Sequence, residues 1–207
     1  EHKAWSNFDA IISINKLEKD KVRKVIPSKE IYFCPMGVDL LNWTYSYAPV
    51  RPLRFGFYGG LGGLVNQRQA LYTFNEIMPF VWEKIPDAEL WLIGSKPPEH
   101  IRNLEVVDNR VHVTGFIEDV APTIAGMTAI FCPWEGVFGF RSRIIEVMAL
   151  GVPVISSPDG VAGMGLSDKK GILLAESPLE FAKLAFQLVG SRAFANKQSL
   201  LARETVE

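Results

Sequence analysis

Four residues between Gly139 and Glu146 have the types and the spacing that nucleotide diphosphate binding requires. A helix is predicted over residues 140–150, so Gly139 lies at its start, where free amides and the helix dipole attract anions. Arg141 falls in the first turn and offers a second anion contact. Arg143 and Glu146 are three residues apart and share a face, which sets a cation for phosphate beside a carboxylate for a ribose diol. The alternative is an ion pair between these two on a solvated face.

A glycine-rich loop at residues 59–63 (Gly-Gly-Leu-Gly-Gly) is the second candidate. It follows a predicted strand at 53–58 and precedes a predicted helix at 67–85. Its backbone can therefore approach a diphosphate or a sugar closely. The spacing is not that of the Rossmann dinucleotide fingerprint. A tight turn between strand and helix is the alternative interpretation.

Other kinds of catalytic site have less support. The histidines and cysteines lack the spacing of metal ligands, so the sequence predicts no metal site and no cofactor. Glu118 and Asp119 are adjacent acids that point apart, and with Glu135 they form a poor pair for glycoside hydrolysis. A helix cap explains Asp119. The sequence contains no Gly-x-Ser-x-Gly elbow and no phosphate-binding lysine loop.

The composition of the 207 residues excludes several classes of protein. Lysine and arginine number 22 against 23 for aspartate and glutamate, a net charge of -1, so nucleic acid is a disfavoured partner. Cys34 and Cys132 both lie in apolar runs, where a reduced, packed thiol is the usual state, and this favours a cytoplasmic protein. No apolar run is long enough to cross a bilayer.

Short β-branched or aromatic runs alternate with stretches of helical period, which predicts an α/β fold with a doubly wound, Rossmann-like parallel sheet. Predicted strands occupy residues 53–58, 89–93, 110–114, 128–132, 152–156 and 171–175. Predicted helices occupy residues 67–85, 119–126, 140–150 and 177–189, with a last one from about 192. Ahead of these lie two further predicted strands, at 8–14 and 30–34, on either side of a charged helix at 16–25. In such a sheet, ligands bind beyond the carboxyl ends of the strands, where both candidate motifs fall.

The run from Gly139 to Ser156 (Gly-Phe-Arg-Ser-Arg-Ile-Ile-Glu-Val-Met-Ala-Leu-Gly-Val-Pro-Val-Ile-Ser) resembles the signature of retaining glycosyltransferases of family 4. These enzymes have the two-domain GT-B fold, and the signature belongs to the C-terminal domain, which binds the nucleotide sugar. Residues 59–66 resemble the family's first loop, residues 114–116 its turn beside the base, and residues 35–39 its interdomain linker. The resemblance covers about residues 30–190.

The resemblance implies a role for each matching residue. Glu146 would bind the ribose, and Arg141, Arg143 and the amides near Gly139 would hold the diphosphate. The remaining donor-binding residues would be Phe140, beside the diphosphate, and Phe116 and Ile117, on either side of the base. The loop of Gly59, Gly60 and Gly62 would lie near the donor sugar. Phe138 stands where the family's first glutamate would be, and the catalytic residues are unassigned.

The same comparison predicts the organisation and partners of the chain. Residues 1–28 would be the remnant of an N-terminal acceptor domain, 29–52 an interdomain strand and linker, and 53–207 the donor-binding domain. The expected function is transfer of a sugar, with retention, from a nucleotide diphosphate to an unknown sugar, lipid or other acceptor, in cell-envelope or polysaccharide biosynthesis. The fragment alone should be inactive, and peripheral membrane contact through the missing domain stays open. The alternatives are a non-catalytic nucleotide-binding or partner-binding module and a sugar-nucleotide epimerase.

Overall fold

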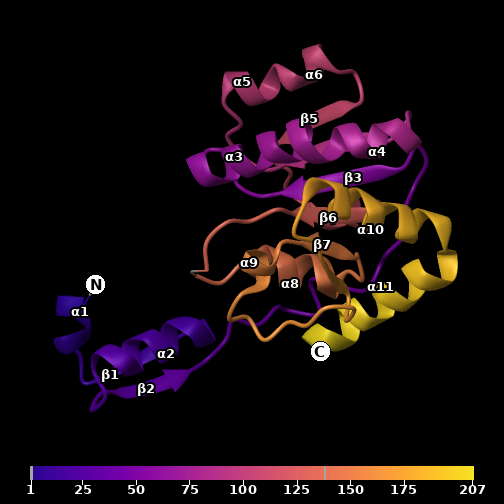
Figure 1. The fold of residues 1–207 in the computed structure, drawn as a ribbon. Helices are drawn as coiled ribbons and strands as arrows, with labels where there is room; N and C mark the ends of the chain where they lie inside the picture. The colour runs from indigo at the N-terminus through magenta and orange to yellow at the C-terminus, as the bar shows by residue number, and fades with distance from the viewer. Residues whose placement is uncertain (1, 138) are drawn as a thin grey trace.

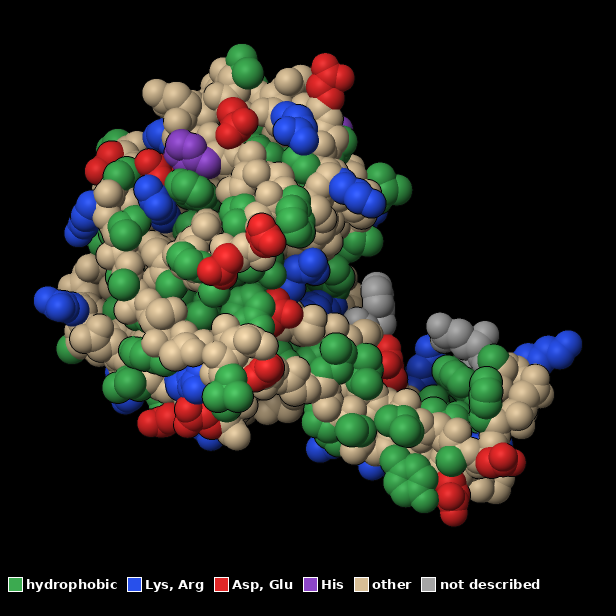
Figure 2. Space-filling view, turned by 180° about the vertical axis from the view of Figure 1, so that it is seen from behind, with side chains coloured by type: hydrophobic (Ala, Val, Ile, Leu, Met, Phe, Trp, Pro, Cys, Tyr) green, Lys and Arg blue, Asp and Glu red, His purple; other side chains and the backbone are tan. Residues whose placement is uncertain are grey.

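The computed structural model describes residues 2–137 and 139–207, apart from the side chain of His2, and folds them into a large and a small lobe (Figure 1 and Figure 2). We call residues 2–34 the N-terminal lobe. Its elements are α1 (His2–Ser6), β1 (Ala10–Ser13), α2 (Lys16–Val25) and β2 (Glu30–Phe33). The two strands pair in parallel, with Ala10 opposite Glu30, and α2 connects them. The predicted helix at 16–25 and its two flanking strands are thus confirmed, with the strands slightly shorter than expected.

The remainder, which we call the main lobe, is built on a six-stranded parallel sheet ordered β5-β4-β3-β6-β7-β8. The strands are β3 (Arg54–Tyr58), β4 (Glu89–Ile93), β5 (Val111–Gly115), β6 (Ala129–Cys132), β7 (Val154–Ser156) and β8 (Ile172–Leu174). All six match predicted strands, and the strand order reverses between β3 and β6. This is the order of a doubly wound Rossmann-like sheet, so the predicted fold class is confirmed.

Helices cover both faces of the sheet (Figure 1). The longer ones are α3 (Leu64–Tyr72), a π-helical turn η1 (Thr73–Ile77), α4 (Met78–Lys84), α8 (Ser142–Ala149), α10 (Pro178–Gly190) and α11 (Arg192–Val206). The short ones are α5 (Glu99–Arg102), α6 (Leu104–Val107), α7 (Ala121–Ala125) and α9 (Pro158–Val161). The segment from α3 to α4 packs with α10 on one face, and α7 and α8 cover the other. The helices between β3 and β4 thus lie on one face of the sheet, and the helices on either side of β6 in the sequence lie on the other.

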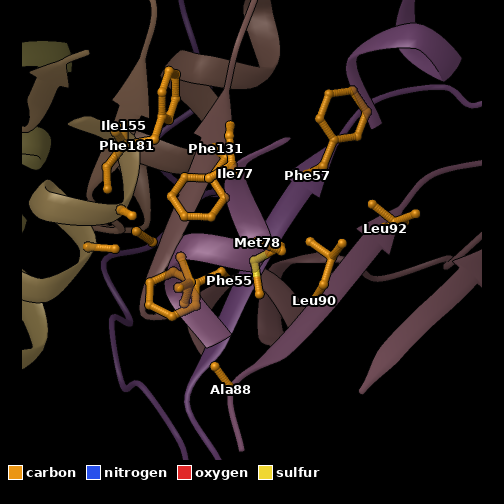
Figure 3. Packing of buried hydrophobic residues seen from close by; sticks show 14 of the residues in the cluster. Phe55, Phe57, Ile77, Met78, Ala88, Leu90, Leu92, Phe131, Ile155 and Phe181 are labelled. Carbon is orange, nitrogen blue, oxygen red and sulfur yellow. The ribbon is translucent and has the colours of Figure 1, made fainter. Parts of the chain in front are cut away.

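Aromatic side chains fill the core beneath α4 and α10 (Figure 3). Phe55 on β3 and Phe131 on β6 stack with ring centroids 5.3 Å apart, and Phe181 from α10 meets Phe131 edge-on at 5.9 Å. These contacts join the two strands between which the order reverses. They fix the position of the carboxyl ends of β3 and β6.

One predicted helix differs in detail. The sequence predicts a continuous helix at 67–85, whereas the chain forms α3, η1 and α4, with a wider turn just before Pro79. Proline has no N–H to donate, and its ring collides with the carbonyl four residues back. The turn widens so that the Met78 N–H donates to the Thr73 carbonyl instead, and the helix continues without breaking.

The segment between the lobes lies along the main lobe. The backbone N–H groups of Ser46, Ala48 and Val50 donate to carbonyls of Leu150, Ala125 and Gly126. None of the helices formed by the described residues has the length and hydrophobicity needed to cross a membrane.

Candidate donor-binding site

A cavity of about 290 Å³ lies at the carboxyl ends of β3 and β6, where the strand order reverses. The end of β3 contributes Tyr58 and Gly59, and the end of β6 contributes Cys132 and Trp134. The segment that leads into α8 closes the third side. This is the place in a doubly wound sheet where ligands bind.

The glycine loop approaches the cavity because its neighbours hold it in place. The Gly59 N–H donates to the Ile93 carbonyl at 3.0 Å, and the Asn66 side chain donates to the Gly60 carbonyl at 2.8 Å. A Cβ on Gly60 would lie 4.0 Å from Nη2 of Arg143, so these two predicted site residues face each other. Gly62 packs instead against Lys96.

Helix α8 begins at Ser142, two residues later than predicted. Arg141 is therefore its N-cap residue and not part of the first turn. Its Nη2 donates to the Gly136 carbonyl at 2.7 Å, and its guanidinium lies 4.4 Å from the Trp134 ring centroid. The later start of α8 has a conformational cause. Gly139 has φ of +74° and Arg141 has ψ of 80°, and neither angle is helical.

The Arg141 guanidinium has unused hydrogen-bonding capacity at the cavity. Its Nε and Nη1 are buried and have no partner among the described residues. Burial lowers its pKa below the usual value, and the nearby Cys132 and Asp159 oppose that shift. A buried cation with two unpaired donors is stabilised by an anion that accepts from both.

Tyr58 links Glu146 to Arg143. The Tyr58 hydroxyl donates to Oε2 of Glu146 at 3.2 Å, and the Arg143 guanidinium lies 5.1 Å from the Tyr58 ring centroid. Burial raises the Tyr58 pKa, Glu146 adds to the rise, and Arg143 opposes it. Arg143 and Glu146 are not among the ion pairs of the described residues, contrary to the alternative drawn from their spacing.

A second cavity of about 130 Å³ adjoins the first and shares Tyr58 and Arg143 with it. Phe116 and Ile117, the residues predicted to flank the base, both line it. Phe116 is 78% exposed, which leaves its ring free for stacking. The two cavities thus meet at Tyr58 and Arg143. Glu146 lines neither cavity and is linked to this boundary by the hydrogen bond from Tyr58.

The structure brings most predicted site residues together. Arg141, Arg143, Gly139, Phe140 and Gly59 line the larger cavity. Phe138 lies outside the described residues. Asp119 accepts from the Ala121 N–H at 3.3 Å, but it is not the cap that the sequence predicted, because the N-cap residue of α7 is Val120. The roles assigned to these residues remain predictions.

Two contributions were not predicted from the sequence. The first is Tyr58, a polar-tipped residue that ends an otherwise apolar strand, and its position at a strand's carboxyl end was the available signal. The second is Glu18 in the N-terminal lobe, whose Oε1 accepts from the Gly139 N–H at 2.7 Å. That amide, expected to face the diphosphate, is thus already hydrogen-bonded.

Comparison with solved structures places this fold among glycosyltransferases. A glycosyltransferase from Rickettsia africae superposes with a TM-score of 0.78 at 15% identity, over 99% of this chain and 61% of its own. Anabaena HepE in complex with UDP and glucose gives 0.73 at 12% identity, over 96% and 58%. The pneumococcal O-GlcNAc transferase GtfA in complex with UDP and GlcNAc gives 0.75 at 14% identity, over 99% and 43%.

These likenesses concern the fold, and the chain spans less than two thirds of each of these proteins. A comparison with curated protein sequences found no match. Residues 53–191, about two thirds of the chain, match the family described as Glycosyl transferases group 1, and they contain both cavities together with the residues predicted to bind the donor. The chain therefore belongs to the group 1 glycosyltransferases.

Proposed function

We propose that this chain is the donor-binding domain of a retaining, family 4 glycosyltransferase and that its ligand is a nucleotide diphosphate sugar. The observation that carries the proposal is the pair of adjoining cavities, which brings two arginines, a nearby carboxylate and an exposed aromatic ring together. Arg141 lies at the larger cavity, Glu146 beside Tyr58, and Phe116 at the smaller cavity. The UDP complexes of HepE and GtfA support a nucleoside diphosphate as the ligand.

In this proposal the smaller cavity takes the base and the larger one takes the diphosphate and the sugar. The Glu146 carboxylate accepts from a ribose hydroxyl, and Tyr58 fixes the carboxylate in position. Arg141, Arg143 and the first-turn amides of α8 stabilise the negative charge that develops on the leaving diphosphate. No catalytic residue is assigned, and no metal or other cofactor takes part in donor binding.

A thermal-shift screen of nucleoside diphosphates and their sugars tests this function. A ligand at 100 times its dissociation constant stabilises the folded state by about 2.7 kcal/mol, which such a screen resolves. Stabilisation by at least one nucleoside diphosphate, unchanged by a chelator, is the expected result. If no nucleoside diphosphate or nucleotide sugar raises the melting temperature, the proposal is wrong.

The non-catalytic module remains the second candidate because Phe138 replaces the family's first glutamate. Such a module would bind the nucleotide but leave the sugar attached to it. We propose that the full-length protein is the cytoplasmic enzyme, acting on an acceptor held outside this chain, and that the chain alone binds donor without efficient transfer. Hydrolysis of the free donor by the full-length protein would exclude the module. A product with altered sugar stereochemistry would favour an epimerase.

Arg141 and Arg143 should recognise charge, and not the nucleoside. Replacing either with glutamine is expected to weaken binding of UDP about tenfold, because a charge-assisted hydrogen bond to phosphate is lost. Binding of uridine should change little. Isothermal titration calorimetry measures both affinities, and Arg192→Gln on α11, exposed and away from both cavities, is the matched control. Equal losses for UDP and uridine would contradict the assigned role.

A further inference from the structure

The N-terminal lobe contacts the main lobe at the loop that leads into α8. Asn15 is fully buried, and its Nδ2 donates to the Gly139 carbonyl at 2.7 Å and to the Ala162 carbonyl at 2.8 Å. Its Oδ1 accepts from the backbone N–H groups of Leu17 and Glu18, at the start of α2. Asn15 thus caps its own helix and at the same time bonds two segments of the other lobe.

Glu18 completes this contact from the first turn of α2. Its carboxylate accepts from the Gly139 N–H, so both backbone groups of Gly139 are bonded to the N-terminal lobe. Beside it, the Lys16 N–H donates to the Gly163 carbonyl at 2.9 Å. Gly163 has φ of +73°, and a Cβ there would overlap the Asn15 amide, with 2.6 Å to its Cγ. The contact therefore requires glycine at this position.

Gly139 lies two residues before Arg141. We propose that Asn15 and Glu18 are positioning residues, which hold Gly139 so that the Arg141 guanidinium is presented to the donor diphosphate. This inference rests on the proposed function. Neither Asn15 nor Glu18 lines a cavity. The N-terminal lobe would therefore contribute to donor binding through the position of the loop.

The geometry favours positioning over competition between Glu18 and the donor. An anion could displace the Glu18 carboxylate from the Gly139 N–H, but it could not replace Asn15, which donates to the carbonyl of the same residue. A diphosphate in the larger cavity has other donors among the lining residues, namely the guanidinium groups of Arg141 and Arg143 and the first-turn amides of α8. The Gly139 amide can therefore stay bonded to Glu18 while the donor is bound.

The test compares Glu18→Ala, Glu18→Gln and the control Asp20→Ala, an exposed acid on the same helix, in the 207-residue chain. Hydrogen–deuterium exchange of residues 139–141 without ligand is expected to accelerate about tenfold in Glu18→Ala, because the hydrogen bond from the Gly139 N–H to a charged group is lost. Glu18→Gln keeps an acceptor oxygen and should restore protection. Gly163→Ala, which leaves the N-terminal lobe unaltered in sequence, should reproduce the effect of Glu18→Ala.

Calorimetry with UDP and uridine then tests the link to the donor. Glu18→Ala should weaken UDP about fivefold, within the range of one lost hydrogen bond, without changing uridine, and Glu18→Gln should bind UDP like the wild type. Stronger UDP binding by both Glu18 variants would show competition and overturn the proposal, as would unchanged exchange in Glu18→Ala. If the wild type binds no nucleoside diphosphate, the proposed function fails, and the exchange measurement alone decides whether Glu18 holds the loop.

Discussion

Replacing Glu146 with alanine is expected to weaken binding of the donor nucleoside diphosphate ten- to a hundredfold. A hydrogen bond from a neutral hydroxyl to a charged acceptor contributes about 1.5 to 3 kcal/mol, and Glu146 is the carboxylate that we propose accepts from the ribose. The affinity for the uncharged nucleoside should fall by a comparable factor, because both ligands carry the ribose. The arginines differ in this respect, because replacing either of them should weaken binding of the diphosphate but not of the nucleoside.

The Glu146 substitution should leave the fold intact. The carboxylate lies on the half-exposed face of α8, and its described hydrogen bond is to the Tyr58 hydroxyl. The buried residues of α8, among them Ile145 and Met148, keep their packing. Calorimetry gives the affinity and thermal unfolding reports the stability, with Glu83→Ala on the exposed face of α4 as the matched control. Wild-type affinity in Glu146→Ala would refute the assigned role.

Replacing Gly94 with alanine is expected to lower the free energy of unfolding by about 3 kcal/mol, at the upper end of the usual cost of overpacking. Gly94 follows β4 and lies against the glycine loop. A Cβ there would overlap the Gly59 carbonyl oxygen and lie 2.7 Å from its carbonyl carbon. Because both atoms belong to the backbone, no side-chain rotation relieves the overlap, and the loop itself must move.

The same substitution should also weaken donor binding, since Gly59 lines the larger cavity. The melting temperature should fall by roughly 6 to 12 °C, at 2 to 4 °C per kcal/mol for a chain of this size. Gly190→Ala is the control, because a Cβ at that helix end meets nothing within 4 Å. A melting temperature equal to that of the wild type would show that the loop adapts at no cost.

The sequence alone predicted the sheet and the region of the site. Each strand is a short apolar run ended by glycine, proline or a helix signal, and such local patterns depend on residues that are near in sequence. The resemblance of residues 139–156 to the family signature predicted which residues face the donor, and the structure places Arg141, Arg143 and Gly139 at one cavity. The match over residues 53–191 confirms the coarser family, the group 1 glycosyltransferases, while family 4 and the retaining mechanism stay predictions.

The exact beginning of α8 could not be predicted from the same segment. Helical periodicity extends back to Phe140, but Gly139 adopts a left-handed conformation, and the helix begins only at Ser142. Both backbone groups of Gly139 are bonded to Asn15 and Glu18, partners more than a hundred positions earlier in the chain. Hydrogen bonds at that separation leave no periodic trace in the sequence.

The tertiary structure alone decided which residues far apart in the sequence contact one another. Tyr58 and Glu146 are 88 residues apart and meet only because β3 and α8 converge at the point where the strand order reverses. Asn15 and Gly139 are 124 residues apart and meet only because α2 begins against the loop before α8. Propensity and spacing act within a few residues along the chain. The partners of a half-exposed carboxylate or of a loop amide are set by packing, which joins segments that carry no local signal of each other.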